Sequence, residues 1–337
     1  MASSSQLEEY SDLVDSELRR VVATRDLPLY SMMGHQLGWS ADPGFDQGSP
    51  LRRLGSLCLG TCAALGGNVE DALPAAAAIE LVQNFCDIHD DVQSGRIERD
   101  GRDTVWWKWG PAQAINAGDG MHALARMALL GMKERGFGPE SVFEAIRVLD
   151  RASLATCEGR FMELEFQERL DLSSDSYLKM ATLKTGSLFA CATEFGSLIC
   201  GTSPDDRNPA VEWGRSLGVA AQIAEDLQQI SSALEIDGVP SDDLMNKRKL
   251  YPVVWAFEEA TPQQRRQLGD YYFKRVLDPS DAKGLATLVD NIGGTEQARS
   301  QIDAQLSESG DRLANALRDE SRREALELIA RTAAGIS

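Results

Sequence analysis

The stretch Phe85-Cys-Asp-Ile-His-Asp-Asp-Val-Gln-Ser94 decides the fold, because it ends a long apolar segment rich in alanine. Apolar residues recur there every three or four positions, which predicts a helix over Leu73 to Asp91. On a helix, Asp87 and Asp91 stand one turn apart, and Asp90 lies three residues from Asp87. Such carboxylates repel one another unless a cation relieves them. Oxygen ligands suit Mg²⁺, so the stretch predicts a magnesium site, with a solvated acidic patch as the alternative.

The helical pattern continues outward over the chain. Residue preferences and apolar spacing predict further helices at 111–133, 139–164, 174–199, 208–234, 251–260 and 297–333. No run alternates polar and β-branched residues, which argues against a sheet. Asp71 and Ser174 are the expected N-caps. With no linker or repeat in the sequence, we predict one all-α domain over residues 1–337, frayed at residues 1–8 and over the last few.

Composition excludes several classes of protein. The chain has 52 acidic and 34 basic side chains and a formal net charge of −18, so general binding of nucleic acid is not expected. Six cysteines in 337 residues make no disulfide framework. The N-terminus lacks the regions of a signal peptide, and the apolar stretch Leu73 to Ile79 is far too short to span a membrane. These features predict a cytoplasmic protein with no stable membrane insertion.

A second acidic segment follows an apolar helix face that contains Leu217 and Ile223. It holds Glu225 and Asp226, and a third candidate carboxylate is Glu163. Two carboxylate-bearing helices that face each other across a bundle would form a clamp for Mg²⁺ and a diphosphate.

In these motifs the chain resembles the trans-isoprenyl diphosphate synthase (polyprenyl synthetase) family. The match covers residues 45 to 260 approximately, and its parts, in the family's order, include 66–81, 88–91, 104–106, 114–119, 177–180, 183–185, Gln222, 225–226, 243–244 and 252–254. The resemblance implies an isoprenoid-synthase type of all-α helical bundle around a deep central cavity, usually as a homodimer. It also implies a reaction in which up to three Mg²⁺ ions bind an allylic prenyl diphosphate, the diphosphate leaves, and isopentenyl diphosphate attacks the carbocation.

Both acidic motifs depart from the family's Asp-Asp-x-x-Asp pattern. The first ends at Ser94, the second reads Glu225-Asp-Leu-Gln-Gln229, and Glu163 stands where the family usually has Asp. We expect Mg²⁺ binding to be altered rather than lost, with Asp87 supplying the missing carboxylate. The resemblance then implies the metal ligands Asp87, Asp90, Asp91, Glu163, Glu225 and Asp226.

The resemblance also assigns the residues around the substrate. The catalytic residues that it implies are Arg99, Lys184, Thr185 and Gln222, and Arg248 is expected to bind the allylic diphosphate as well. Phe85 and Cys86 stand where the family forms the floor of its cavity, which implies a C15 to C20 chain.

The isopentenyl diphosphate site matches the family poorly. Arg52 keeps one expected contact and Gln83 is compatible with the family, but Ser49 replaces a Lys and Asp100 replaces an Arg. The later loop reads Asp237-Gly-Val-Pro240, without the usual Gly-Lys. A cation replaced by an anion beside a diphosphate costs binding energy.

We therefore expect the ionising half of the site to be kept and the elongating half to be degraded. The sequence favours a Mg²⁺-dependent terpene synthase that ionises an allylic diphosphate and cyclises or rearranges it. Three alternatives stay open: a short-chain synthase that makes farnesyl or geranylgeranyl diphosphate, a prenyltransferase with another acceptor, and a catalytically silent subunit.

Overall fold

The computed structural model describes residues 2–22, 25–39, 50–169, 171–235 and 240–336. Helices dominate these residues, so the all-α prediction is confirmed. The strands among them are β1 (Glu98–Arg99) and β2 (Arg102–Asp103), which pair as an antiparallel hairpin. Asp100 and Gly101 form its turn with φ of 51° and 71°. Two-residue strands are too short to show alternation, so the sequence pattern missed them.

The chain packs as two compact units. Unit 1 comprises Met1–Ser153, Leu188–Val211 and Ala314–Ala333, and unit 2 comprises Leu154–Ser187, Glu212–Leu313 and Ala334–Ser337. The long helices α7 (Pro139–Phe166), α10 (Pro204–Leu234) and α15 (Gly294–Ala316) each contribute residues to both units. Neither unit is one continuous segment, and the prediction of a single domain stays a prediction.

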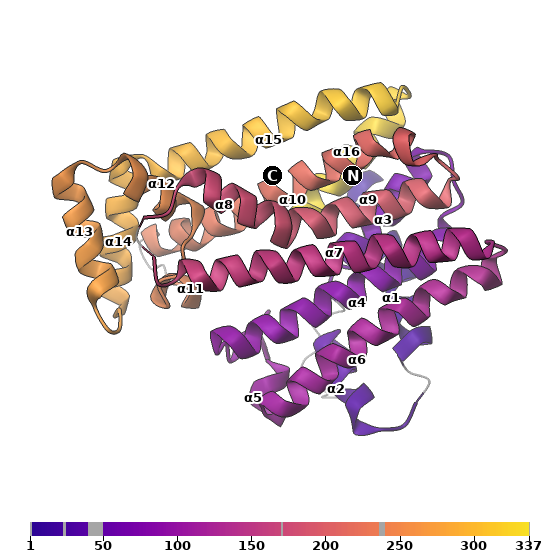
Figure 1. Cartoon of the computed structure of the whole chain (residues 1–337), viewed down its shortest axis with the longest axis horizontal. Coiled ribbons are helices and arrows are strands. Elements are labelled where there is room, and N and C mark those ends of the chain that lie inside the picture. The colour runs from indigo at the N-terminus through magenta and orange to yellow at the C-terminus, as the bar shows by residue number, and fades with distance from the viewer. Residues whose placement is uncertain (1, 23–24, 40–49, 170, 236–239, 337) are drawn as a thin grey trace. The chain divides into compact units, whose positions relative to one another are not determined.

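Unit 1 is built around α4 (Val69–Ser94), which lies beside α3 (Arg53–Ala64) and α6 (Pro111–Leu130) (Figure 1). Ala75 to Ala78 on α4 are fully buried, and such small side chains let neighbouring helices approach closely. The unit also contains α1 (Ala2–Val22), α2 (Pro28–Gln36), α5 (Val105–Trp109), the 3-10 helix η1 (Gly131–Arg135), α9 (Ser187–Ile199) and α16 (Glu320–Ala334). Helix α1 begins at Ala2, inside the end that the sequence predicts to be frayed.

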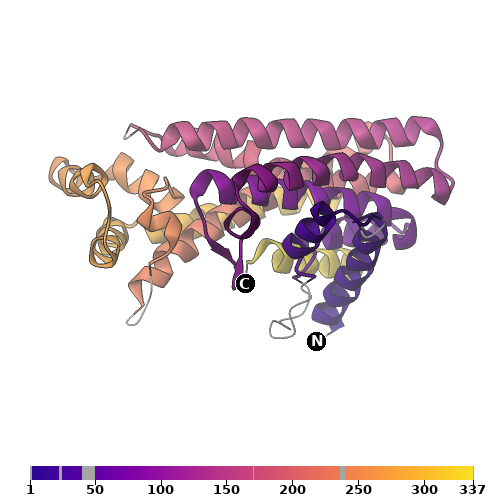
Figure 2. The ribbon, with the colours of Figure 1, turned by 90° about the horizontal axis from the view of Figure 1, so that it is seen from below.

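The ends of α4 explain where the acidic stretch is placed. Asn68 is its N-cap and accepts a hydrogen bond from the backbone N–H of Glu70 at 3.3 Å, so the predicted cap Asp71 was wrong. Gly95 ends the helix in the left-handed region, with φ of 67°. The hairpin β1–β2 follows at once, and Figure 2 shows it beside the end of α4. The hairpin therefore carries Arg99 back toward the acidic end of α4.

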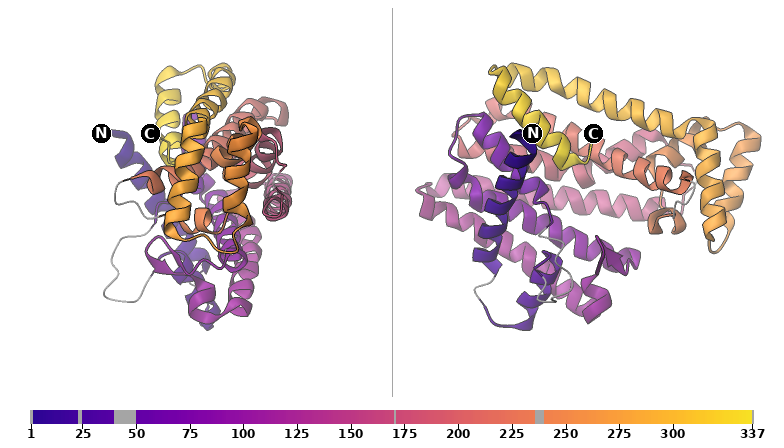
Figure 3. Two further views of the ribbon diagram at one scale, coloured as in Figure 1. Left: turned by 90° about the vertical axis from the view of Figure 1, so that its left-hand side faces the viewer. Right: turned by 180° about the vertical axis from the view of Figure 1, so that it is seen from behind.

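Unit 2 contains two apolar cores. One involves α12 (Tyr251–Glu259), α13 (Pro262–Phe273) and α14 (Pro279–Ile292), and the last two lie side by side in Figure 3. The other packs Tyr177 of α8 (Ser174–Ala181) with Ile223 of α10 and Tyr251. The short α11 (Asp242–Met245) completes the unit.

Two predicted helices are interrupted. Residues 174–199 contain the π-helix η2 (Thr182–Gly186) between α8 and α9, and residues 297–333 are broken between α15 and α16. The cap of α8 is Ser173, whose side chain accepts from the Ser176 N–H at 3.2 Å, rather than the predicted Ser174. Among the helices that the structure describes, none has the length and apolar character needed to cross a bilayer.

Candidate functional site

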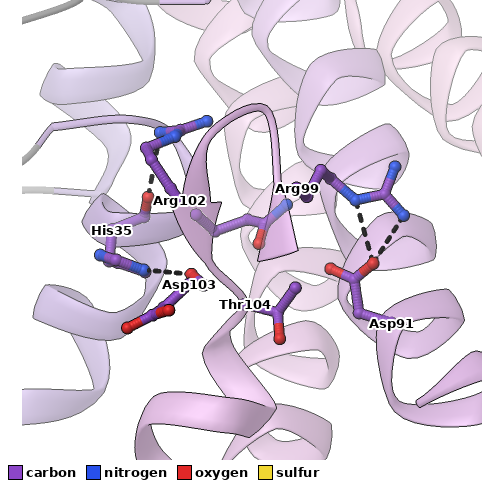
Figure 4. A pocket seen from close by; sticks show the side chains of 7 residues that line it. His35, Asp91, Arg99, Arg102, Asp103 and Thr104 are labelled. Atoms are coloured by element: carbon purple, nitrogen blue, oxygen red, sulfur yellow. Dashed lines mark hydrogen bonds and ion pairs between the residues drawn. The ribbon is translucent and has the colours of Figure 1, made fainter. Parts of the chain in front are cut away.

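In unit 1, three acidic side chains near the C-terminal end of α4 gather around one guanidinium (Figure 4 shows Asp91 and Arg99). Arg99 donates from Nη2 to Asp91 Oδ1 at 2.6 Å and from Nε to the same oxygen at 3.0 Å. The same Nη2 lies 3.3 Å from Asp90 Oδ2, and Nη1 lies 3.7 Å from Asp87 Oδ1. Asp87 thus belongs to the cluster, as the sequence predicted. Ser94 does not replace a carboxylate, because its hydroxyl donates to the backbone oxygen of Asp90 at 2.8 Å.

The three carboxylates of this cluster carry more negative charge than the single Arg99 guanidinium neutralises. Burial raises the pKa of Asp91 to about 6, against the lowering effect of the Arg99 hydrogen bonds. Oδ2 of Asp91 is buried and has no hydrogen-bond partner. An orphaned carboxylate oxygen beside two further carboxylates is a donor set that fits Mg²⁺. In the described ranges, however, no three acidic, His or Cys side chains already converge as metal ligands, because Arg99 takes the central position.

A small pocket opens beside this cluster (Figure 4). Its lining consists of His35, Gln36, Asp91, Arg99, Arg102, Asp103 and Thr104. Arg102 donates to the backbone oxygen of His35 at 3.4 Å, and His35 Nε2 lies 2.7 Å from the backbone oxygen of Asp103. The sequence analysis missed His35 and Arg102. Arg102 could have been selected from the sequence, because it is a basic residue two positions after Asp100. His35 gave no such signal, because it lies far from this segment in the sequence.

Arg52 lies in the same unit, where its charge acts on Arg102 of the pocket. Its side chain is 2% exposed, pairs with Asp15, and donates to the backbone oxygen of Leu37 at 2.6 Å. The hydrogen bonds of this guanidinium are used inside the protein, so the structure gives Arg52 a packing role. Ser49 and residues 237–239 lie outside the described residues.

Phe85 is held between two imidazoles on the face of α4 that packs on α6. Its ring stacks on His122 of α6 at 5.0 Å and meets His89 edge-on at 4.7 Å. Cys86 beside it is half-buried. Gln83 donates to Asp87 Oδ1 at 3.0 Å and so orients one carboxylate of the acidic cluster. The bulky floor residue that the sequence predicted is therefore fixed by ring contacts from two helices.

Unit 2 contains a cluster in which positive charges outnumber negative ones. Three cations surround the carboxylate of Glu163: Lys184 Nζ at 2.8 Å, Arg248 at 3.3 Å, and Arg160. Burial alone would raise the pKa of Glu163, but these three cations outweigh it and hold the pKa far below its usual range. Asp243 pairs with Arg248 at 2.9 Å. Glu163 is thus engaged by cations, and the cluster keeps an excess of positive charge that suits an anion.

A polar network lies nearby in the same unit. Thr185 donates to Gln222 at 2.7 Å, and Gln222 donates to Asp226 Oδ1 at 3.1 Å. Asp226 Oδ2 accepts from the Tyr251 N–H at 2.7 Å and from the Tyr177 hydroxyl. Burial raises the pKa of Asp226 to about 7. The structure brings the predicted Thr185, Gln222 and Asp226 together, whereas the side chain of Glu225 is exposed.

The π-helix η2 sets the position of Lys184 and Thr185. Gly159 of α7 packs directly on it, and a Cβ at Gly159 would lie 2.4 Å from the backbone nitrogen of Lys184. The missing side chain lets Lys184 come close enough to reach Glu163. Single π-turns of this kind are frequent at functional sites.

The sequence of this chain is similar to those of a known protein family. The family model of polyprenyl synthetase matches residues 46–289. A geranylgeranyl diphosphate synthase of Mycobacterium tuberculosis is 33% identical over 306 residues, which cover 89% of this chain and 86% of that protein. A short chain isoprenyl diphosphate synthase of Methanothermobacter thermautotrophicus is 33% identical over 279 residues, or 82% of this chain and 83% of that protein.

Solved structures share the fold. A polyprenyl synthetase from Streptomyces coelicolor superposes with a TM-score of 0.88 at 27% identity, over 98% of this chain and 99% of that one. The family match spans well over half of the chain, and these two relatives align with 89% and 82% of it. The chain is therefore an enzyme of the polyprenyl synthetase family, with that family's all-α isoprenoid synthase fold.

Proposed function

We propose that the protein is a short-chain trans-prenyl diphosphate synthase, which joins isopentenyl diphosphate to an allylic prenyl diphosphate. Relatives with 30–33% identity are named as farnesyl, geranylgeranyl or short-chain isoprenyl diphosphate synthases. None of these names denotes a cyclase, so the sequence-based preference for a terpene synthase finds no support in the comparisons. The alternative of an ordinary elongating enzyme is the better supported reading.

The observation that carries the proposal is the pair of guanidinium groups, Arg99 and Arg102, that lies beside Asp91. The sequence suggested that Asp100 and Ser49 had removed the cations needed by isopentenyl diphosphate. Arg99 and Arg102 nevertheless both line the small pocket beside Asp91. Two guanidinium groups are suited to bind a diphosphate through paired hydrogen bonds. We therefore assign the isopentenyl diphosphate to Arg99 and Arg102, without Arg52.

The acidic cluster would hold Mg²⁺ through Asp87, Asp90 and Asp91. Bound there, the metal would neutralise the negative charge of a substrate diphosphate. The donor set fits, because its three side chains offer only oxygen and one buried oxygen of Asp91 has no partner. A metal at this position would compete with Arg99 for the carboxylate of Asp91.

The cations of unit 2 would bind the allylic diphosphate. Lys184, Arg248 and Arg160 exceed the charge of Glu163, and preorganised cations stabilise the negative charge that develops on a departing diphosphate. Thr185 and Gln222 continue this polar lining, and Asp226 orients Gln222. In this arrangement Glu163 fixes the positions of the three cations through its ion pairs.

The length of the prenyl product is proposed from the residues that precede the first acidic motif. Phe85 is fixed between His89 and His122, so its ring cannot turn aside without losing both contacts. With Cys86 as its modest neighbour, we propose products of C15 to C20.

The test uses purified protein, Mg²⁺, and geranyl or farnesyl diphosphate, each with and without isopentenyl diphosphate. We expect longer prenyl diphosphates only when isopentenyl diphosphate is present, and Arg102→Ala should raise its KM without a comparable change in the KM of the allylic substrate. Hydrocarbons or terpene alcohols formed without isopentenyl diphosphate would instead establish the cyclase. If neither product forms, the protein is a silent subunit or uses another acceptor.

A further inference from the structure

Two cysteines that the proposed reaction does not use face each other in unit 1. Cys62 lies on α3 and Cys200 directly follows α9, so 138 positions separate them in sequence. Their sulfur atoms are 3.8 Å apart, and Cys200 Sγ also lies 3.5 Å from the backbone oxygen of Cys62. Both thiols are free. Two sulfurs at van der Waals distance need only a small movement to form a bond.

The surroundings leave room for both sulfurs. Gly67, in the turn between α3 and α4, donates its N–H to the backbone oxygen of Cys62 at 2.9 Å. A Cβ at Gly67 would lie 2.5 Å from Cys200 Sγ and 2.6 Å from Cys62 Sγ. Any side chain at this position would push the two sulfurs apart, so the glycine permits their contact.

The two thiols differ in reactivity. Cys62 is buried, whereas Cys200 is half-buried and open to a small oxidant. The hydrogen bond between the two sulfurs, together with burial, raises the pKa of Cys62. The same hydrogen bond, helped by the Gly67 N–H and opposed by burial, lowers the pKa of Cys200. Cys200 is therefore the sulfur that a peroxide meets first.

We propose that Cys62 and Cys200 form a peroxide-sensitive pair that closes to a disulfide and ties α3 to the start of the α9–α10 connection. The Cys200 thiolate attacks one oxygen of hydrogen peroxide, so a sulfur–oxygen bond forms and hydroxide leaves to become water. The Cys62 sulfur then attacks this sulfenic acid, the sulfur–oxygen bond breaks, and a second water leaves with the Cys62 proton. Two thiols lose two electrons, and the peroxide is reduced to two waters.

Oxidation should stabilise unit 1 rather than stop the reaction. The disulfide would close a long loop, which removes entropy from the unfolded chain. We expect the melting temperature to rise by about 5 °C or more. Neither cysteine is among the residues assigned to metal or diphosphate, so turnover with prenyl substrates should change little, and a failure of the proposed function leaves this inference standing.

The experiment treats the full-length Cys157→Ser variant with hydrogen peroxide, because Cys157 is an exposed thiol that would react on its own. We expect a loss of two titratable thiols, a peptide that links Cys62 to Cys200, and reversal by dithiothreitol. Cys200→Ala added to this background should abolish both the link and the melting shift. Adding Cys191→Ser should preserve them, since that buried thiol serves as the matched control.

A link between Cys58 and Cys62, or two thiols that remain free after oxidation, would overturn the proposal. Because Cys62 is fully buried, Cys62→Ser can unfold the protein, and Cys200→Ala therefore carries the test. A link that forms without any rise in the melting temperature would refute the stabilising effect.

Discussion

At the scale of single residues, Lys249 is a charged residue that is buried inside the protein. Its side chain is 7% exposed, and its Nζ is buried without a hydrogen-bond partner. The ammonium lies 3.7 Å from the centre of the Tyr272 ring, and this cation–π contact offsets part of the cost of burial. Burial, and to a smaller extent Lys247, lower the pKa of Lys249 to about 8. The folded state therefore holds this proton less tightly than the unfolded chain.

Lys249→Met should raise the free energy of unfolding by about 2 kcal/mol at pH 7. Between pH 8 and the ordinary value of 10.5, the unfolded chain binds more protons at this group, so its contribution to stability improves as the pH rises. The advantage of the variant should therefore shrink between pH 8 and pH 10.5. Urea unfolding at pH 7 and pH 10 measures both effects. The exposed Lys133→Met is the control, and an advantage that is equal at both pH values would contradict the assignment.

Asp87→Asn should raise the Mg²⁺ concentration for half-maximal diphosphate release by about tenfold or more. Asp87 faces Arg99 together with Asp90 and Asp91, and Ser94 supplies no carboxylate. Ser94→Asp is the companion variant and should lower the requirement. The control is Asp119→Asn, an exposed carboxylate that lies 3.7 Å from His89 and outside the acidic cluster. An unchanged Mg²⁺ dependence of Asp87→Asn would remove Asp87 from the metal site.

At the scale of elements, the contact between α7 and η2 decides whether Lys184 reaches Glu163. Gly159→Ala would place a methyl group 2.4 Å from the Lys184 nitrogen and 2.7 Å from its Cα, so the two helices must separate. We expect a loss of roughly 1–3 kcal/mol in the free energy of unfolding. Allylic diphosphate binding, measured by calorimetry, should weaken as well.

Gly310→Ala is the matched control for this prediction. Gly310 lies within α15, and no other group would lie within 4 Å of its added Cβ. Alanine in an open helical position stabilises by roughly 0.5–1 kcal/mol, so the same substitution should have opposite signs at the two sites. Equal effects at both positions would show that the close approach at Gly159 is unimportant.

At the scale of the whole molecule, α7 exposes several large apolar side chains. Phe143, Leu154 and Phe161 are 70%, 62% and 63% exposed. They are spaced by 11 and 7 residues, which puts them on one face of the helix. Exposed apolar stripes of this kind mark interaction surfaces. The prediction of a homodimer would be met if a second copy of the chain covered this face.

Phe143→Glu should shift the protein toward the monomer, because it places a charge in the proposed apolar contact. Sedimentation velocity over a range of protein concentrations measures the effect. Phe273→Glu is the control, since Phe273 is 80% exposed at the end of another helix, α13. A native protein that is monomeric at every concentration would refute the homodimer.

The sequence by itself determined the fold class and the types of residue in the site. Helical periodicity depends on neighbours in sequence, so α4, α6 and α7 were predicted with only small errors at their ends. The carboxylates of α4 share one helix, and their spacing alone predicted that Asp87 joins Asp90 and Asp91. Local hydrogen bonding was harder to predict, which is why Asn68 and Ser173 replaced the expected caps.

Tertiary structure decided which charges are available to a substrate. Arg52 is consumed by Asp15, a residue 37 positions away, whereas Arg102 lines the pocket beside Asp91. Glu163 pairs with Lys184, which is 21 positions away in sequence, and with Arg248, which is 85 positions away. Such pairings depend on how helices pack, and a sequence pattern records only separation along the chain. For this reason the sequence motifs predicted the family, while the partner of each charge emerged only from the fold.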